Sequence, residues 1–141
     1  MNNDEKKQII LEFLKKHTLG VIATTYPDGT PEAAAIDFSV RDNLEIVFDT
    51  FKETHKYPNL LQKGDVAVVV GWDENITVQY EGKAFEVSSS EVETYKKEHI
   101  EKVPFEKQFV DRGAVMFKII PRLIRYSNFN KEPPEKIEVR F

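Results

Sequence analysis

The chain contains no cysteine, which excludes disulfide bonds, thiolate metal ligands and cysteine nucleophiles. No apolar run approaches the roughly 20 residues that a bilayer-spanning helix needs. The opening MNNDEKKQ is too polar for a secretory signal. We therefore expect a cytoplasmic protein with no membrane partner. An excess of basic residues is also missing, and the formal net charge of −4 argues against a nucleic-acid partner.

The common catalytic motifs are absent as well. There is no G-x-S-x-G, H-E-x-x-H, P-loop or Rossmann glycine pattern. The three histidines, His17, His55 and His99, are far apart in the chain, and most carboxylates fall on expected helix surfaces. A metal site would need these groups to converge, so we predict none, and we assign no catalytic residue.

What the chain does contain is typical of one folded domain over residues 1–141. Its 141 residues match the size of an ordinary domain, and no linker divides them. Ten Phe, five Tyr and one Trp supply large side chains for a core.

The first half of the chain predicts one helix and then strands. Apolar residues recur at helical spacing from Asp4 to His17. Strands are predicted over Leu19–Thr25, Pro31–Val40 and Leu44–Asp49, with turn residues between them. Loops of hairpin length predict that these three strands form an antiparallel meander.

The second half adds more strands and a surface helix. Asp65–Trp72 is almost continuously apolar, which predicts burial on both faces, with Trp72 in the core. Gly82 within Ile76–Val87 predicts a bulge or a bend. Ser88 to Lys102 reads as a charged, exposed helix opened by two overlapping capping boxes.

The sum is a mainly β protein, a small antiparallel β-barrel of six or seven strands with peripheral helices. Ala114 to Arg125 supplies the last long strand and residues 137–141 a short terminal one. An oligonucleotide-binding barrel shares this description, but the acidic balance and the lack of a basic, aromatic stripe disfavour it.

Polar and cationic groups crowd the loop after the third strand. Thr50, Lys52, Thr54, His55 and Lys56 lie between that strand and a predicted helix from Lys56 to Lys63. A phosphate-binding site is favoured by such hydroxyl donors, by a lysine, and by the free N–H groups at the start of a helix. In the alternative interpretation, Thr54 only caps the helix and the lysines are solvated.

A run of three alanines, residues 33–35, is unusual inside a strand, because alanine has poor strand propensity. Short side chains allow a flat ring to approach the backbone. They equally allow two strands to cross closely, and the sequence leaves both interpretations open.

The string F-x-T-x-x-x-T-x-K, from Phe48 to Lys56, resembles the flavin-phosphate segment of the pyridoxamine 5′-phosphate oxidase-like family, the FMN-binding split barrels. Thr50 matches the family's threonine, Thr54 stands in for its serine and Lys56 matches its lysine. His55 stands where an arginine often accompanies the site, which implies weaker FMN affinity. The similarity extends from about Leu19 to Val87.

The resemblance implies a dimeric split barrel with FMN bound between two subunits. The second predicted strand, which contains the three alanines, would lie along the isoalloxazine ring. The late strand, around Arg122, Arg125 and Tyr126, would contact the cofactor of the other subunit. The implied cofactor-binding residues are Ala34, Ala35, Ile36, Asp37, Phe48, Asp49, Thr50, Thr54, His55 and Lys56.

Three functions remain open at this point. The first is an FMN-dependent oxidoreductase that acts on an unidentified small molecule, with NAD(P)H or oxygen as its redox partner. The second is a protein that holds flavin, deazaflavin or haem without catalysis. The third is a dimeric barrel with no cofactor. The family's C-terminal Arg-x-His substrate motif is missing, which argues against vitamin B6 oxidation.

Overall fold

A computed structural model describes all residues from Met1 to Phe141. Its helices and strands follow one another in this order: α1 (Asn3–Lys15), β1 (Leu19–Thr25), β2 (Pro31–Asp37), β3 (Ser39–Val40), β4 (Ile46–Thr50), α2 (Lys56–Gln62), β5 (Asp65–Val70), β6 (Ile76–Glu86), α3 (Val92–Lys102), the 3-10 turn η1 (Pro104–Glu106), α4 (Lys107–Val110), β7 (Val115–Asn128) and β8 (Glu135–Arg140).

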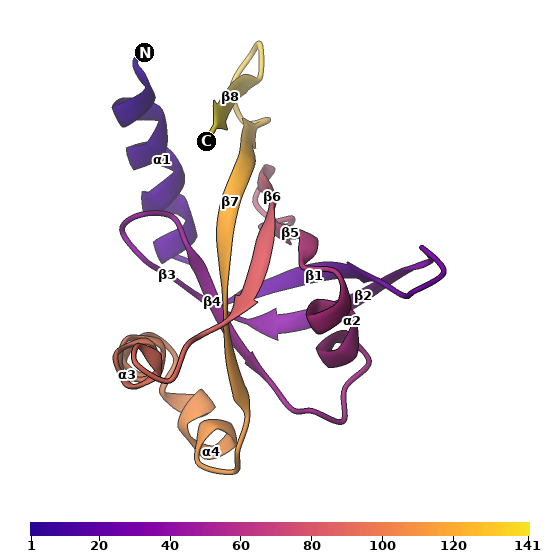
Figure 1. The fold of residues 1–141 in the computed structure, drawn as a ribbon. Helices are drawn as coiled ribbons and strands as arrows, with labels where there is room; N and C mark the ends of the chain where they lie inside the picture. Colours follow the sequence, from indigo (N-terminus) through magenta and orange to yellow (C-terminus); the bar gives the residue numbers. More distant parts are fainter.

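All strands pair antiparallel in one sheet of order β2-β1-β5-β6-β7-β4-β3, and β8 pairs with the second half of β7. The two ends of this order, β2 and β3, are consecutive in the chain and separated only by Phe38. The sheet therefore curls back on itself into a half-barrel (Figure 1). The predicted mainly β barrel with peripheral helices is confirmed, with eight strands in place of six or seven.

The predicted second strand divides at Phe38, and this changes the expected meander. Phe38 is completely buried, and its N–H bonds to the Thr18 carbonyl. Before this residue the strand pairs with β1, and after it with β4, so β2 and β4 form no ladder. One edge of β2 is consequently unpaired.

The predicted bulge at Gly82 is confirmed, because the register between β6 and β7 shifts between Glu81 and Gly82. A side chain at Gly82 would clash with the backbone carbonyl of Ile120. Glycine thus allows the two long strands to bend together around the core.

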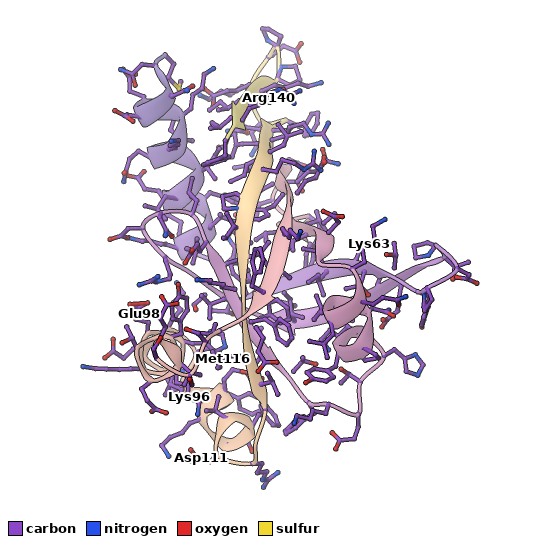
Figure 2. All side chains as sticks on the ribbon, viewed as in Figure 1. Lys63, Lys96, Glu98, Asp111, Met116 and Arg140 are labelled. Atoms are coloured by element: carbon purple, nitrogen blue, oxygen red, sulfur yellow. The ribbon has the colours of Figure 1, made fainter.

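Helix α2 packs beside β1 and β6, and the other helices lie toward the two ends of the long strand β7 (Figure 1). β8 and both chain termini lie at one end, and α3 and α4 lie together at the other (Figure 1). The buried face of α1 packs against β3 and β8 and joins the main core through Ile10, Leu11, Phe13 and Leu14. Under α3 and α4 lies a smaller apolar cluster, in which Met116 of β7 lies close to the helices (Figure 2).

The capping boxes predicted before α3 do not form. The Ser88 hydroxyl bonds to the Glu91 carboxylate, and the residue before the helix, Glu91, makes no side-chain cap bond. The helix is not wholly exposed either, because Tyr95 and His99 are buried beneath it.

The prediction that β5 is buried on both faces is wrong for the isolated chain. Val66, Val68 and Val70 face the core, whereas Ala67 is exposed and Val69 is half-buried on the outer face. Trp72, predicted in the core, is 54% exposed just beyond the strand. None of the helices combines the length and apolar character needed to cross a membrane.

Candidate functional site

A cavity of about 180 Å³ opens where the unpaired edge of β2 faces the end of β4. Its walls come from β2, β4, the loop before α2, η1 and α4. The lining residues are Ala35, Ile36, Asp37, Asp49, Thr50, Phe51, Thr54, Lys56, Glu106 and Phe109. Seven of the ten residues predicted from the sequence are among them: Ala35, Ile36, Asp37, Asp49, Thr50, Thr54 and Lys56.

The loop between β4 and α2 folds the two threonines against each other. The hydroxyl oxygens of Thr50 and Thr54 lie 2.8 Å apart, and the Thr54 hydroxyl donates to the Phe51 carbonyl at 2.9 Å. Thr50 is almost completely buried, while Thr54 is partly exposed. Two hydroxyls thus form one polar wall of the cavity.

Thr54 does not cap the helix, so the alternative interpretation of that residue is wrong. His55 occupies the capping position, and it makes no side-chain cap bond. The helix α2 has only seven residues, so any anion site here must depend on side chains more than on a helix dipole.

Lys56 is a half-buried cation that forms no salt bridge. Burial lowers the pKa of its ammonium group, and the charges of Glu32 and Asp49 partly oppose this shift. A cation that has lost part of its hydration without gaining a carboxylate partner favours an anion in the adjoining cavity.

The structure does not bring the other three predicted residues to the cavity. Phe48 is fully buried and stacks on Phe117 with ring centroids 5.7 Å apart. Ala34 packs against the main core. The exposed His55 places its Nδ1 atom 3.0 Å from the Tyr26 hydroxyl oxygen.

The cavity also has an acidic wall made of Asp37, Asp49 and Glu106, of which the sequence predicted the two aspartates but not Glu106. Glu106 of η1 lies against the carboxyl groups of Asp37 and Asp49. Burial, followed by hydrogen bonds and charge repulsion from these two neighbours, raises the pKa of Glu106 to about 9. Glu106 therefore holds its proton more tightly than an ordinary carboxyl group does.

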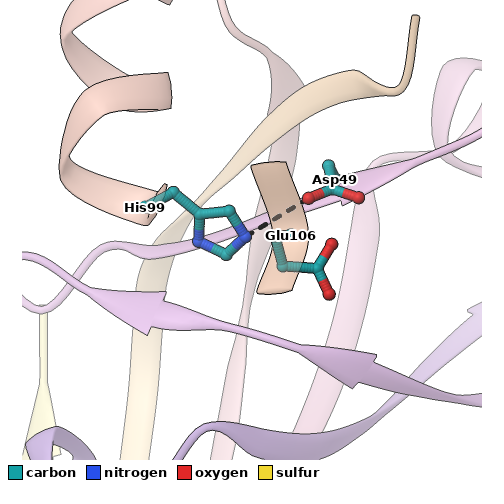
Figure 3. Close-up of side chains that lie close together, drawn as sticks. All are labelled: Asp49, His99 and Glu106. Atoms are coloured by element: carbon teal, nitrogen blue, oxygen red, sulfur yellow. Dashed lines mark ion pairs between the residues drawn. The ribbon is translucent and has the colours of Figure 1, made fainter. Parts of the chain in front are cut away.

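His99 completes this cluster, so one of the three histidines does converge with carboxyl groups, contrary to the expectation from the sequence. Its Nε2 atom lies 3.3 Å from Oδ2 of Asp49, and the side chains of His99, Asp49 and Glu106 converge from three different elements (Figure 3). One sequence signal was available. Val92, Tyr95 and His99 recur at i, i+3 and i+7, which marks the inward face of an otherwise charged helix.

Of the three late-strand residues expected near a partner's cofactor, two are exposed and one is buried. Arg122 and Arg125 are exposed and both bond to Glu81, at 2.7 and 3.0 Å. Tyr126 instead packs in the core, edge-on to Phe13. Only the two arginines can reach another molecule.

Comparison with known sequences identifies one family. The family model described as pyridoxamine 5′-phosphate oxidase matches residues 7–128 of the chain. General stress protein 26 of Bacillus subtilis (strain 168) is 30% identical over 146 residues, which cover 99% of this chain and 100% of that protein.

Two solved structures show the same fold at low sequence identity. A heme binding protein from Mycobacterium smegmatis matches 96% of this chain with a TM-score of 0.83 and 13% identity, and the match covers 57% of that protein. A pyridoxamine 5′-phosphate oxidase-related, FMN binding protein from Nostoc punctiforme PCC 73102 matches 100% of this chain and 97% of its own, with a TM-score of 0.67 and 10% identity.

Proposed function

The chain belongs to the pyridoxamine 5′-phosphate oxidase family, and we propose that it binds FMN and uses it to oxidise or reduce a small molecule. NAD(P)H is the proposed electron donor if the small molecule is reduced, and oxygen is the proposed electron acceptor if it is oxidised. The FMN-binding protein from Nostoc punctiforme, which shares the fold, supports the choice of cofactor.

The environment of Lys56 is the observation that most supports FMN binding. It is half-buried, has no carboxylate partner and borders the cavity beside the hydroxyls of Thr50 and Thr54. A phosphate group restores the polar contacts that the ammonium group loses on burial, and the two hydroxyls supply further donors. These three side chains fit the phosphate end of FMN.

The unpaired edge of β2 suits the polar edge of the flavin ring. Because β2 forms a ladder only with β1, its alternate N–H and C=O groups point away from that neighbour. The edge runs past Ala35, Ile36 and Asp37, which line the cavity. The small side chain of Ala35 leaves this backbone accessible. FMN bound here supplies the electron or hydride transfer, and the chain supplies binding and orientation.

A second copy of the chain is the proposed cover for the rest of the cofactor. The cavity, at about 180 Å³, is smaller than the roughly 300 Å³ at which typical ligand sites begin. The chain also carries an apolar groove of about 210 Å³ on the outer face of β1, β5 and β6. Its apolar side chains on β1 and β5 are those of Val21, Ala23, Ala67 and Val69.

The composition of β5 supports this dimer. Its run of apolar residues is typical of a strand covered on both faces, yet one face is open in the single chain. A second copy that packs on the groove covers that face, with Gln79, Glu81 and Arg125 at its polar rim.

The absorption spectrum and the mass of whatever co-purifies with the protein test the proposal. We expect a flavin spectrum and the mass of FMN, and bleaching of the bound flavin by NADPH without oxygen. A bound flavin that no nicotinamide reduces would favour a non-catalytic carrier. A Soret band would favour haem, and a colourless protein that takes up no FMN would overturn the proposal.

A further inference from the structure

We propose that Asp49, His99 and Glu106 form a binding site for a divalent first-row transition-metal ion such as Zn²⁺ or Mn²⁺, with the Asp37 carboxyl group beside them as a further oxygen donor. The three residues come from β4, α3 and η1 and meet beneath the cavity wall (Figure 3). This site does not depend on bound FMN.

The ligand atoms are already gathered. Each residue offers one donor atom, and these atoms all lie within 4.8 Å of one another. The separation of 3.3 Å between His99 Nε2 and Asp49 Oδ2 matches the spacing of two ligands on one ion. Ligands held about 2.0–2.1 Å from a tetrahedral ion are about 3.3–3.4 Å apart.

Two of these atoms have no hydrogen-bond partner. His99 is completely buried, and its Nε2 atom accepts and donates no hydrogen bond. Oδ2 of Asp49 is likewise unpaired, on a side chain that is 7% exposed. Their mutual contact is close, but it does not satisfy either atom. Buried polar atoms are rarely left in this condition, and a shared cation satisfies both together.

Ser39 holds the imidazole ring in place. Its hydroxyl oxygen lies 2.8 Å from Nδ1 of His99, and both side chains are buried. When Nδ1–H donates to Ser39, the lone pair of Nε2 is free and directed at the two carboxyl groups. A bond of this kind to the second nitrogen is what fixes the tautomer of metal-binding histidines.

Charge and access also favour a cation. The carboxyl groups of Asp37, Asp49 and Glu106 crowd together at the cavity wall. A divalent ion relieves the repulsion between neighbouring carboxylates. Asp37, Asp49 and Glu106 all line the open cavity, so an ion has a route from solvent.

The donor set selects the class of metal. One imidazole with several carboxylate oxygens suits Zn²⁺, Mn²⁺ or Fe²⁺. Ca²⁺ and Mg²⁺ prefer sites made of oxygen alone. The absence of cysteine excludes thiolate sites.

Direct metal binding to the full-length, chelator-treated protein tests the site. We expect Zn²⁺ and Mn²⁺, each titrated alone in a calorimeter, to bind with one ion per chain. Co²⁺ should give the visible bands of a nitrogen- and oxygen-ligated ion. The variants His99→Gln and Asp49→Asn should each weaken binding by about 10-fold or more, since second-shell changes alone typically cost that much.

His17→Gln is the matched control, because His17 lies just beyond the end of α1, away from the cluster, and its ring bonds to the Phe13 carbonyl. It should bind metal as the wild type does. Circular dichroism shows which variants fold. If His99→Gln does not fold, Asp49→Asn alone is used for the comparison with the wild type. Failure of the wild type to bind either ion with one-to-one stoichiometry would overturn the site. Equal metal affinity in the wild type and in a folded Asp49→Asn variant would also overturn the site. FMN titration of the same samples reports separately on the flavin site.

Discussion

The hydroxyl of Thr50, the last residue of β4, lies 2.8 Å from the hydroxyl of Thr54, two residues before α2 begins. The contact folds the intervening loop into a compact turn, which the bond from Thr54 to the Phe51 carbonyl closes. Lys56 follows directly and borders the same cavity. A single short segment therefore presents two hydroxyls and an ammonium group to one space.

Replacing Lys56 with alanine tests the proposed phosphate contact. Loss of a charge-assisted hydrogen bond should weaken FMN binding by about 1.5–3 kcal/mol, which is about 10- to 150-fold in Kd. Quenching of flavin fluorescence measures this change. Lys52→Ala is the control, because Lys52 is exposed in the same loop and does not line the cavity. Equal affinity of the two variants would remove Lys56 from the site.

Thr54 should contribute less than Lys56. Its hydroxyl already donates to Phe51, so a phosphate must compete with that carbonyl. We expect Thr54→Ala to weaken FMN binding by about 0.5–1.5 kcal/mol. Thr54→Ser keeps the hydroxyl and should bind as the wild type does. If Thr54→Ser bound FMN as weakly as Thr54→Ala, the methyl group rather than the hydroxyl of Thr54 would contribute to FMN affinity.

Val69 tests the proposed dimer contact. It lies on the outer face of β5, in the groove that we assign to a second copy. A buried, unpaired carboxylate strongly disfavours association, so Val69→Asp should shift the protein from dimer to monomer. Light scattering after gel filtration measures the mass. Leu61→Asp is the control, since Leu61 is exposed on α2 and outside the groove. A wild-type monomer, or a Val69→Asp dimer, would contradict the assignment.

The sequence predicts best what a short segment determines. Thr50, Thr54 and Lys56 are separated by only six positions, so one loop brings them together and local pattern suffices. Gly82 was predictable for a similar reason, because a bulge is a local event.

The convergence of His99 and Glu106 with Asp49 was not predictable in this way. His99 and Asp49 are 50 positions apart, and they meet only because α3 packs over the end of β4. The charged sequence of α3 suggested full exposure and concealed its buried face. Conversely, the apolar sequence of β5 predicted burial on both faces, whereas its outer face is open in the single chain, and this is the face on which we propose that a second copy packs.

Glu106 predicts a pH dependence of stability in the metal-free protein. The groups that face it are Asp37 from β2, Asp49 from β4 and His99 from α3. Its pKa is raised to about 9 in the folded state from 4.5. Between these values the native state holds a proton that the unfolded state releases. The free energy of unfolding therefore falls as pH rises, by up to about 1.4 kcal/mol per pH unit.

Glu106→Gln cannot ionise, so its stability should fall less steeply between about pH 5.5 and pH 8. Urea unfolding with chelator present measures the slope. Glu86→Gln, at an exposed position on β6, should keep the wild-type slope. Identical slopes in all three proteins would show that Glu106 is already ionised in the native state.

Substitution of Ser39 tests whether its hydroxyl fixes the tautomer and orientation of the His99 imidazole for metal binding. Without its hydroxyl, Nδ1 loses its only hydrogen bond, and the proton is free to move to Nε2, where it blocks metal binding. We expect Ser39→Ala to weaken Zn²⁺ binding by about 10-fold, the lower range for second-shell changes. Nitrogen-15 shifts of the ring report the tautomer directly, and a change confined to packing would not alter them. Ser39→Thr keeps a hydroxyl and should restore both the Nδ1–H tautomer and the affinity. If Ser39→Ala retains that tautomer and full affinity, Ser39 does not position His99.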